Sequence, residues 1–378
     1  MSTDLLELAE LCIRTGSDFA AITVRQALQP VGGKGTEVFP PTYPAPASWP
    51  KNEPWLGYAV DTMPDNTKTC LLDSVPAQAH RMSALFKQDE YRDLVPQIVI
   101  RLTTGTSLNL LDLGHRVADF AVRNSSLKEE VREAILSLHR GNALPLARLS
   151  PTSLLFGFWD SRDTKIKTPR VLRSLIRARG VTVLSRSTVY RPAADYEELG
   201  VLKRLGNVSS DTLTSVGAVH YRAVMQPGGV LAEEILRLSS VSLVALRALS
   251  AGDGHDSDDT LRLRRYILAL ALVCLTATHD TCLRLREGCE LVPESPAETW
   301  LVRHDGSRER ASMPDHSKAL EHARGAAREL GIAGQTRDSV FDVKAAEDDI
   351  RRAIKKKHEE KSGATGKEQD SDDKAESA

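Results

Sequence analysis

Hydrophobic and polar residues along this chain follow two different periods, so the pattern predicts both helices and strands. Residues 1–16 place Leu5, Leu8 and Cys12 on one face, which predicts a short amphipathic helix. Residues 19–28 partly alternate and are rich in branched side chains, which predicts a first strand. Strands are then expected at 69–73, 94–102, 107–113, 181–184, 216–224, 289–292 and 299–303. Helices are expected at 76–86, 114–122, 127–139, 241–249, 260–278 and 315–331, and residues 230–242 fit a strand or a short helix.

Breaks in the pattern divide these elements. Residues 29–54 are dense in glycine and proline, an irregular stretch that is either a functional loop or surface padding. Residues 226–229 (Gln-Pro-Gly-Gly) predict a turn, and residues 304–306 (His-Asp-Gly) predict a hairpin turn. We expect one domain over 1–340 and a charged tail over 341–378. The tail should be largely disordered, although part of it can form a helix.

The segment 150–180 turns abruptly from aromatic to basic. Seven lysines and arginines stand between 162 and 179, against the single acid Asp163. Thr168 as an N-cap, Pro169 in the first turn and Gly180 as a stop predict a helix. On that helix one face carries Arg170, Arg173 and Arg177, and the other carries Val171, Leu172, Leu175 and Ile176. Such a helix is either a floor for a polyanion or a solvated surface face.

A second stretch, 69–86, predicts a strand that ends at Asp73 and a helix that Pro76 opens. Ser74, Gln78 and Arg81 would bring a hydroxyl, an amide and a guanidinium to this junction. Together with free backbone N–H groups they suit a phosphate. An ordinary capped helix with polar outer residues is the other interpretation.

The composition argues against several classes of protein but does not select one function. The formal charge is −1, from 50 basic and 51 acidic residues, so the basic segment is a local feature. Five cysteines without a Cys-x-x-Cys pair disfavour a zinc site or a disulfide framework and fit a reducing cytoplasm. Acids near the N-terminus speak against a signal peptide, and the apolar run 266–276 is too short to span a bilayer.

Common sequence motifs for catalysis and cofactor binding are absent. The chain contains no phosphate-binding loop, dinucleotide fingerprint, His-Glu-x-x-His or Gly-x-Ser-x-Gly, and no cofactor is expected. His80 and His115 are possible general acids or bases toward a ribose hydroxyl, although a structural role for each histidine is the simpler reading. Aspartates that could hold Mg²⁺ have no distinctive spacing: Asp61, Asp65, Asp73 and Asp112.

Four stretches in this order resemble a known family. They are RQALQPVGG (25–33) with FPPTY (39–43), CLLDSVPAQAHRM (70–82), LLDLGHRVADFAVR (110–123) and LSPTSLLFGFWDSRDTKIKTPRVLRSLIRA (149–178). The combination resembles the backbone RAMP subunit of the type I CRISPR effector complex, in the variant called I-U or I-G. LRRYILALALV (263–273) and GCELVP (288–293) also fit, so the resemblance spans roughly 18–330.

The resemblance implies a ferredoxin-like (RRM-like) core with large helical and loop insertions. It implies a non-catalytic subunit whose copies line up along a CRISPR guide RNA, beside other subunits of the complex and the target DNA strand, in the cytoplasm and with no membrane. A thumb-like hairpin is expected within 181–230, with the loop 30–60 as its competitor, and FGFWDS becomes a core signature. The expected RNA-binding residues are Arg25, Ser74, Gln78, Arg81, Arg116, Arg162, Lys165, Lys167, Arg170, Arg173 and Arg177.

The physics of guide binding agrees with this implication. A guide has a variable sequence, so its holder must bind phosphate and ribose instead of base edges. Only 5% of the residues are aromatic, which is few for a stacking single-strand binder or a sequence-reading RRM. Two alternatives stay open at this point: a RAMP-type endoribonuclease using His80, His115 or Asp73, and an interaction protein without nucleic acid.

Overall fold

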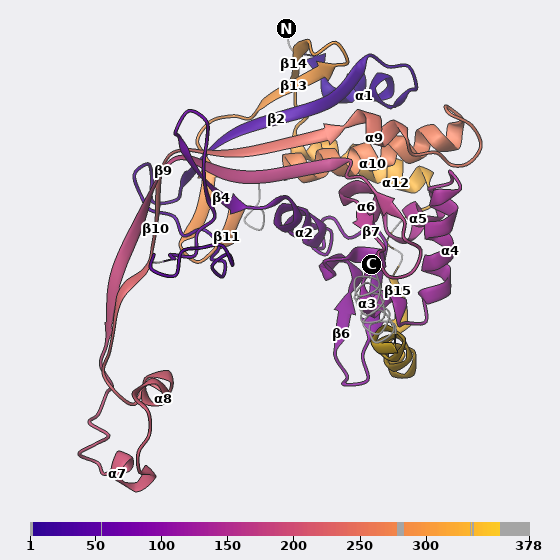
Figure 1. The fold of residues 1–378 in the computed structure, drawn as a ribbon. Helices are drawn as coiled ribbons and strands as arrows, with labels where there is room; N and C mark the ends of the chain where they lie inside the picture. Colours follow the sequence, from indigo (N-terminus) through magenta and orange to yellow (C-terminus); the bar gives the residue numbers. More distant parts are fainter. Residues whose placement is uncertain (1–2, 54, 278–282, 333, 335, 356–378) are drawn as a thin grey trace, which may run out of the picture.

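The computed structural model describes residues 3–53, 55–277, 283–332, 334 and 336–355, and it has the expected α+β fold (Figure 1). The main path of the large sheet has the order β1-β14-β13-β2-β10-β9-β4-β3. These strands are β1 (Thr3–Asp4), β14 (Arg308–Ser312), β13 (Glu298–Arg303), β2 (Phe19–Pro30), β10 (Tyr221–Ser242), β9 (Leu172–Tyr190), β4 (Lys68–Asp73) and β3 (Val60–Thr62).

The four central strands give the fold its ferredoxin-like character. In chain order they are β2, β9, β10 and β13, and in the sheet they lie as β13-β2-β10-β9 with every neighbouring pair antiparallel. Helices intervene between β2 and β9 and again between β10 and β13, which is the βαββαβ arrangement. The topology therefore confirms the ferredoxin-like core that the resemblance implied.

Helices pack on one face of this sheet. Along β2, Ile22, Val24 and Leu28 are buried in this direction, while Thr23 and Arg25 point the other way. The main core combines Ile22 and Val24 with four helices, whereas Leu28 belongs to the smaller core described below. The four helices are α1 (Leu5–Ile13), α9 (Leu243–Arg247), α10 (Asp258–Thr276) and α12 (His316–Glu329). All of these helices lie within or close to ranges that the hydrophobic pattern predicted.

A helical insertion between β4 and β9 builds the rest of the body (Figure 1). It contains α2 (Val75–Leu85), α3 (Phe120–Arg123), α4 (Lys128–His139), α5 (Leu144–Leu149) and α6 (Pro151–Phe156). It also contains β5 (Gln97–Arg101) and β6 (Ser107–Asn109), which form a second sheet with β15 (Thr336–Val340). The parallel strand β15 is a feature that the sequence pattern did not predict.

Strands β9 and β10 extend beyond the sheet as a two-stranded ribbon (Figure 1). The ribbon projects away from the body and carries α7 (Val201–Leu205) and α8 (Ser210–Ser215) at its far end. The predicted turn at 226–229 is wrong, because β10 runs through it, with register shifts between Ala223 and Gln226 and between Pro227 and Val230. Gly229 has a φ of +91° at this irregularity, a conformation that glycine adopts without strain.

The base of the ribbon has a smaller core of its own. Val38 and Tyr58 from the irregular loop 30–60 pack there with Leu72, Ile176 and Leu291. Two short strands complete this region, β11 (Arg284–Arg286) and β12 (Cys289–Pro293), and β12 pairs with the end of β2. The loop is thus a packed wall of the ribbon base, with the Tyr58 hydroxyl accepting a hydrogen bond from Gly229 N at 2.9 Å.

The predicted helix over 168–180 is wrong, because this segment is the start of β9. It pairs with β10 on one side and with β4 on the other. The local signals Pro169 and Gly180 resemble helix ends, but the period of burial is two: Leu172, Ser174, Ile176 and Ala178 are buried, and the arginines alternate with them. Pairing on both edges outweighs local propensity here.

Smaller differences occur elsewhere. The expected strand 107–113 stops at Asn109, where a 3₁₀ turn, Leu110–Asp112, begins. The expected helix over 114–122 is a 3₁₀ turn at Arg116–Ala118 followed by α3. In the expected tail, residues 343–355 are helical, and residues 356–378 lie outside the described part of the chain.

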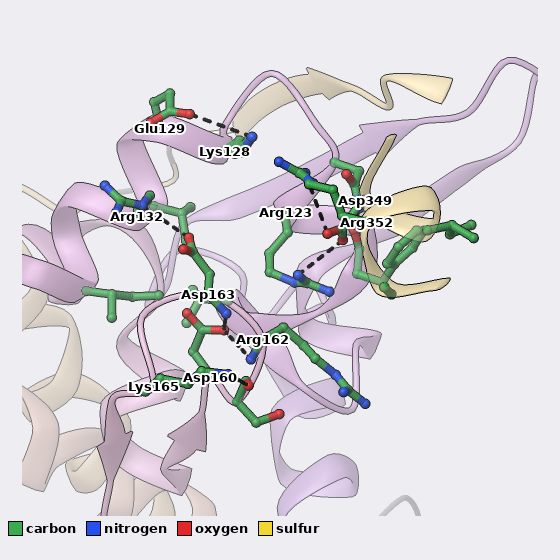
Figure 2. A pocket seen from close by; sticks show the side chains of 18 residues that line it. Arg123, Lys128, Glu129, Arg132, Asp160, Arg162, Asp163, Lys165, Asp349 and Arg352 are labelled. Atoms are coloured by element: carbon green, nitrogen blue, oxygen red, sulfur yellow. Dashed lines mark hydrogen bonds and ion pairs between the residues drawn. The ribbon is translucent and has the colours of Figure 1, made fainter. Parts of the chain in front are cut away.

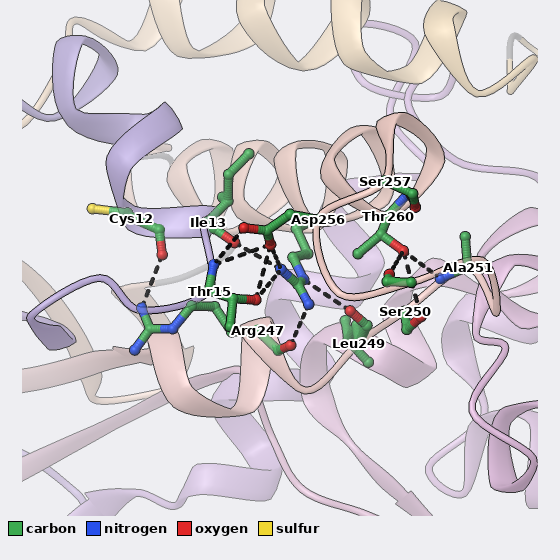
Figure 3. A network of polar contacts seen from close by, with 12 residues as sticks. Cys12, Ile13, Thr15, Arg247, Leu249, Ser250, Ala251, Asp256, Ser257 and Thr260 are labelled. Carbon is green, nitrogen blue, oxygen red and sulfur yellow. Dashed lines mark hydrogen bonds and ion pairs between the residues drawn. The ribbon is translucent and has the colours of Figure 1, made fainter.

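The acidic loop 252–259 is tied to the helical layer by a polar network (Figure 3). Arg264 of α10 is 1% exposed and donates to Leu249 O at 2.8 Å, to Ile13 O at 3.0 Å and to Asp256 Oδ1 at 2.9 Å. Asp256 also accepts from Thr15 N at 3.1 Å. This loop therefore joins α1 to α10 through a buried guanidinium.

Candidate nucleic-acid interface

The sheet face opposite the helices, here called the open face, carries exposed and half-buried side chains. It presents Thr23 and Arg25 from β2, Leu236 from β10, and Arg173 and Arg177 from β9. These residues lie on adjacent strands, since β2, β10 and β9 are neighbours in the sheet. The predicted grouping of Arg173 and Arg177 on one face holds, but on a strand instead of a helix.

The arginines of the open face differ in their partners. Arg25 forms an ion pair with Glu234 at 2.5 Å, and Arg179 forms one with Asp65 at 3.0 Å. Arg173 and Arg177 form no hydrogen bond or ion pair through their side chains with any described residue. Their guanidinium groups are therefore the cations of this face that can bind an external anion without first releasing a carboxylate.

The basic loop at 160–167 lies between β7 (Phe158–Trp159) and β8 (Lys167–Thr168). Asp160 accepts from Thr164 N at 2.8 Å and from the Thr164 hydroxyl at 2.7 Å, which holds the loop in shape. Burial opposes ionisation of Asp160, but these hydrogen bonds outweigh it and lower the pKa of its carboxyl. Arg170 follows the loop, is exposed, and has no acidic partner among the described residues.

Arg162 and Lys165 of this loop line a pocket of about 760 Å³ (Figure 2). The opposite walls come from α3, α4 and the helix 343–355. Acids already pair with several of its cations: Arg123 with Asp349 at 3.2 Å and Arg132 with Asp163 at 3.2 Å. The pocket is thus a mixed-charge surface in which Arg162 and Lys165 carry the positive charge that no carboxylate contacts.

Trp159 corrects the expectation that FGFWDS is entirely core. Phe156 and Phe158 are buried, but the Trp159 side chain is 61% exposed. Lys167 Nζ lies 5.9 Å from the centre of the Trp159 ring, so this lysine flanks an exposed aromatic face. Strand alternation explains the difference, because Phe158 and Trp159 point to opposite sides of β7.

The junction 73–81 contains a largely buried cluster of hydrogen-bonded side chains around Asp73, here called the lock, instead of an exposed phosphate site. Gln78 is 0% exposed and donates to Asp73 Oδ2 at 2.8 Å. Arg81 donates to the same oxygen at 3.1 Å and to the backbone oxygen of Leu285. Ser74 caps α2, its hydroxyl accepting from Ala77 N at 3.3 Å. The structure therefore places Gln78 in the interior, and Arg81 and Ser74 are engaged within the protein.

Arg116 is also placed inside the protein. It is 7% exposed, stacks over the Phe156 ring at 5.1 Å and donates to Gly157 O at 3.3 Å. Burial, assisted by the nearby charge of Arg170, lowers the pKa of its guanidinium to about 10. The structure therefore places Arg116 inside the protein, next to the segment that carries Arg170.

The remaining candidates for metal binding or catalysis are dispersed. Asp65 pairs with Arg179, Asp112 pairs with Lys87 at 2.6 Å, and Asp73 is buried in the lock. His80 and His115 are exposed and lie on separate elements. No three His, Cys, Asp or Glu side chains within the described ranges come together as a metal site.

Sequence reasoning overlooked the ion pairs that separate one arginine from another. It also missed Trp159, for which the alternation of Phe158 and Trp159 was the available signal. In the described part of the chain, no helix combines the length and hydropathy needed to cross a bilayer.

Comparison with known proteins gives one family match. Residues 22–183 match the family model described as CRISPR-associated protein GSU0053 (Cas_GSU0053). No curated protein matches the chain. The matched segment runs from β2 into β9 and so includes Arg25, Arg173 and Arg177. This match supports a CRISPR-associated protein.

Proposed function

We propose that this protein is a non-catalytic backbone subunit of a type I CRISPR effector complex, which binds the guide RNA and lines up in several copies along it. The guide would follow the open face of the ferredoxin-like sheet. The target DNA strand would then pair with guide bases that the protein leaves unread, as part of antiviral defence in the cytoplasm.

The observation that carries this proposal is the pair Arg173 and Arg177 on the open face. Both are without a partner among the described residues, and they stand four residues apart on one strand, about 13 Å along it. Guanidinium groups at this spacing suit phosphates two nucleotides apart on an extended single strand. Arg170 and Lys167 supply further positive charge on the segment that precedes β9.

The projecting ribbon supports the assembly part of the proposal. Its far half and tip expose apolar side chains, a composition that suits contact with another protein surface. These residues are Val189, Tyr190, Leu199, Val201, Leu205, Val216 and Tyr221. We assign the ribbon as the thumb, reaching toward a neighbouring copy on the same guide. Contacts that join different surfaces of identical subunits generate an open filament.

The test is binding of labelled single-stranded RNA to the full chain carrying Arg173→Glu and Arg177→Glu. We expect weaker binding to RNAs of any sequence and a salt dependence whose logarithmic slope falls by about 1.4 for two lost contacts. The matched control is Arg92→Glu with Arg101→Glu, the same double charge reversal at exposed arginines that pair with Asp89 and Asp338. An affinity and slope equal to those of the control would show that the open face is not the guide site.

The same preparation separates this function from an endoribonuclease. Labelled guide precursor and complementary RNA are incubated with the protein, with and without Mg²⁺. Uncut RNA is expected, while cleavage that disappears in His80→Ala or His115→Ala would replace the scaffold proposal by an enzyme.

A further inference from the structure

A second cavity, of about 490 Å³, lies between the helix-covered face of the sheet and the ends of α10 and α12. Its floor is formed by Val24 and Gln26 of β2 and by Ser239 and Arg237 of β10, which are paired in register. Leu275 and Thr276 at the end of α10 and His316 at the start of α12 form the inner wall. Residues 293–297, which connect β12 to β13, form the rim. The size lies within the range of small-molecule sites.

Gln26 is the unusual member of this lining. It is 7% exposed, it points toward the helical side of the sheet, and its side chain has no hydrogen-bond partner among the described residues. The amide lines the cavity, so its two donors and its acceptor are open to a group bound there. An amide that faces a cavity without a partner among the described residues therefore points to a ligand.

The other walls define the shape and chemistry of that ligand. Val24, Leu275 and Met313, with prolines at 293, 296 and 314, are apolar. Polar groups lie on the floor, at the rim (Glu294 and Ser295) and on the inner wall, where His316 is held by Thr276 Oγ1 and by the Tyr91 hydroxyl, each at 2.9 Å. A ligand with apolar faces and a hydrogen-bonding edge matches this arrangement. Among common biological groups, a nucleobase has that form.

We propose that this cavity binds a nucleobase, with the Gln26 amide pairing with the edge of the base and the apolar walls covering its faces. The base can belong to a free nucleotide or to an unstacked residue of a single strand, and the chemistry of the contact is the same. The site lies on the helical side of β2, on the other face of the strand from Arg25. It is therefore separate from the open face.

The experiment uses two probes with the full chain: 2-aminopurine riboside monophosphate, and a single-stranded RNA that contains one 2-aminopurine. Fluorescence titration measures binding of each to the unaltered protein and to Gln26→Leu. We expect about tenfold to a hundredfold weaker binding of at least one probe to Gln26→Leu, as is typical for a lost bidentate contact. Because the Gln26 side chain makes no hydrogen bond to a described residue, we also expect the thermal midpoint of this variant to stay the same or rise.

The matched control is Gln29→Leu, the same chemical change three residues further along β2 on the open face. Ala297→Phe, at the exposed rim, tests occupancy without altering the floor and should block the same probe. Loss of the free nucleotide assigns the cavity to nucleotides, and loss of the oligonucleotide signal alone assigns it to a strand. If neither probe binds, or if Gln26→Leu binds like Gln29→Leu, the proposal is overturned.

The outcome is distinguishable from that of the proposed guide-binding function. Arg173→Glu with Arg177→Glu should leave the free nucleotide bound while the oligonucleotide is weakened. Conversely, Gln26→Leu should leave the salt dependence of overall RNA binding unchanged.

Discussion

Arg81 and Asp73 are joined across the junction between β4 and α2, with Nε of Arg81 3.1 Å from Oδ2 of Asp73. The carboxylate is 1% exposed, and Arg286 lies 3.7 Å from its other oxygen. Arg81 also donates to the backbone of β11, so it connects the β4–α2 junction to a segment that is distant in the sequence. This pair fixes the edge of the sheet beneath the ribbon.

Removing this guanidinium should therefore affect folding before it affects RNA. Arg81→Ala leaves a buried carboxylate with weaker compensation, and we expect the free energy of unfolding to fall by about 2–3 kcal/mol. Denaturant unfolding measures the loss. An unchanged stability together with weaker RNA binding would return Arg81 to the guide site.

Asp256 should be important for the stability of the helical layer. Asp256→Asn removes the carboxylate that pairs with the buried Arg264, so we expect a loss of about 2 kcal/mol in the free energy of unfolding. Asp259→Asn is the matched control, because Asp259 pairs with Arg262 on the exposed helix surface, where such pairs contribute about 0.5 kcal/mol or less. Equal effects of the two changes would contradict the role given to the Arg264 network.

The ionisation of Asp256 should make the stability of the protein depend on pH in the acidic range. Burial acts to raise the pKa of Asp256, but hydrogen bonds from Thr15 and Arg264 outweigh it, so the pKa is lowered from 3.8. A folded-state pKa below the unfolded value stabilises the protein above the unfolded pKa, and this contribution is lost as pH falls through the folded pKa. In unfolding measured below about pH 4, Asp256→Asn should therefore lose its difference from the unaltered protein. A difference that persists at low pH would assign the effect to packing.

The buried thiols predict that the free energy of unfolding falls at alkaline pH. Burial raises the pKa of Cys12 and Cys289 to about 11 and that of Cys70 to about 12. Because the folded pKa exceeds the unfolded value, the stabilisation is complete below about pH 9 and is lost as pH rises through 11. We expect a decrease of roughly 2 kcal/mol per thiol over this window. Denaturant unfolding at pH 8, 10 and 11 measures it, and Cys70→Ser should reduce the slope.

Reactivity provides an independent check on the same thiols. Cys12, Cys70, Cys274 and Cys289 should react with a thiol reagent at the rate of global unfolding, because all four are buried. Rapid labelling of these four in the native protein would show that their sites open locally.

The ribbon can be shortened without disturbing the body. Tyr190 and Tyr221 are paired across β9 and β10, so an Asn-Gly turn placed between them would close the hairpin and delete residues 191–220. We expect an unfolding free energy within about 0.5 kcal/mol of the full chain, because α7 and α8 lie away from the body (Figure 1). Light scattering of the complex with a long RNA should show fewer copies per strand. Unchanged copy number would remove the ribbon from the assembly contact.

Local patterns in the sequence determined much of the fold. Alternation marked β2, and Ser74 with Pro76 marked the start of α2, because a strand face and a helix cap are decided by residues close in sequence. The His-Asp-Gly turn between β13 and β14 was predicted for the same reason. Where the sequence resembles the RAMP family, the ferredoxin-like order of the strands was predicted as well.

Tertiary pairing decided what local signals misjudged. The segment that begins at Pro169 became a strand because β10 and β4 flank it, and β15 formed because β5 offered an open edge. Neither partner lies within the local sequence window, so no cap or period could reveal them.

The candidate RNA-binding residues were likewise predicted in part from the sequence, and in part only the tertiary structure decided their availability. The sequence by itself determined that basic residues gather between 162 and 179 and that a polar strand-to-helix junction follows β4. Only the tertiary structure decided that Arg173 and Arg177 are without partners in the described chain while Arg25 and Arg179 are paired, and that Gln78 and Arg116 are buried. The physical reason is that residue type sets what a side chain can bind, whereas burial and neighbouring charges, contributed by distant segments, set whether it is available.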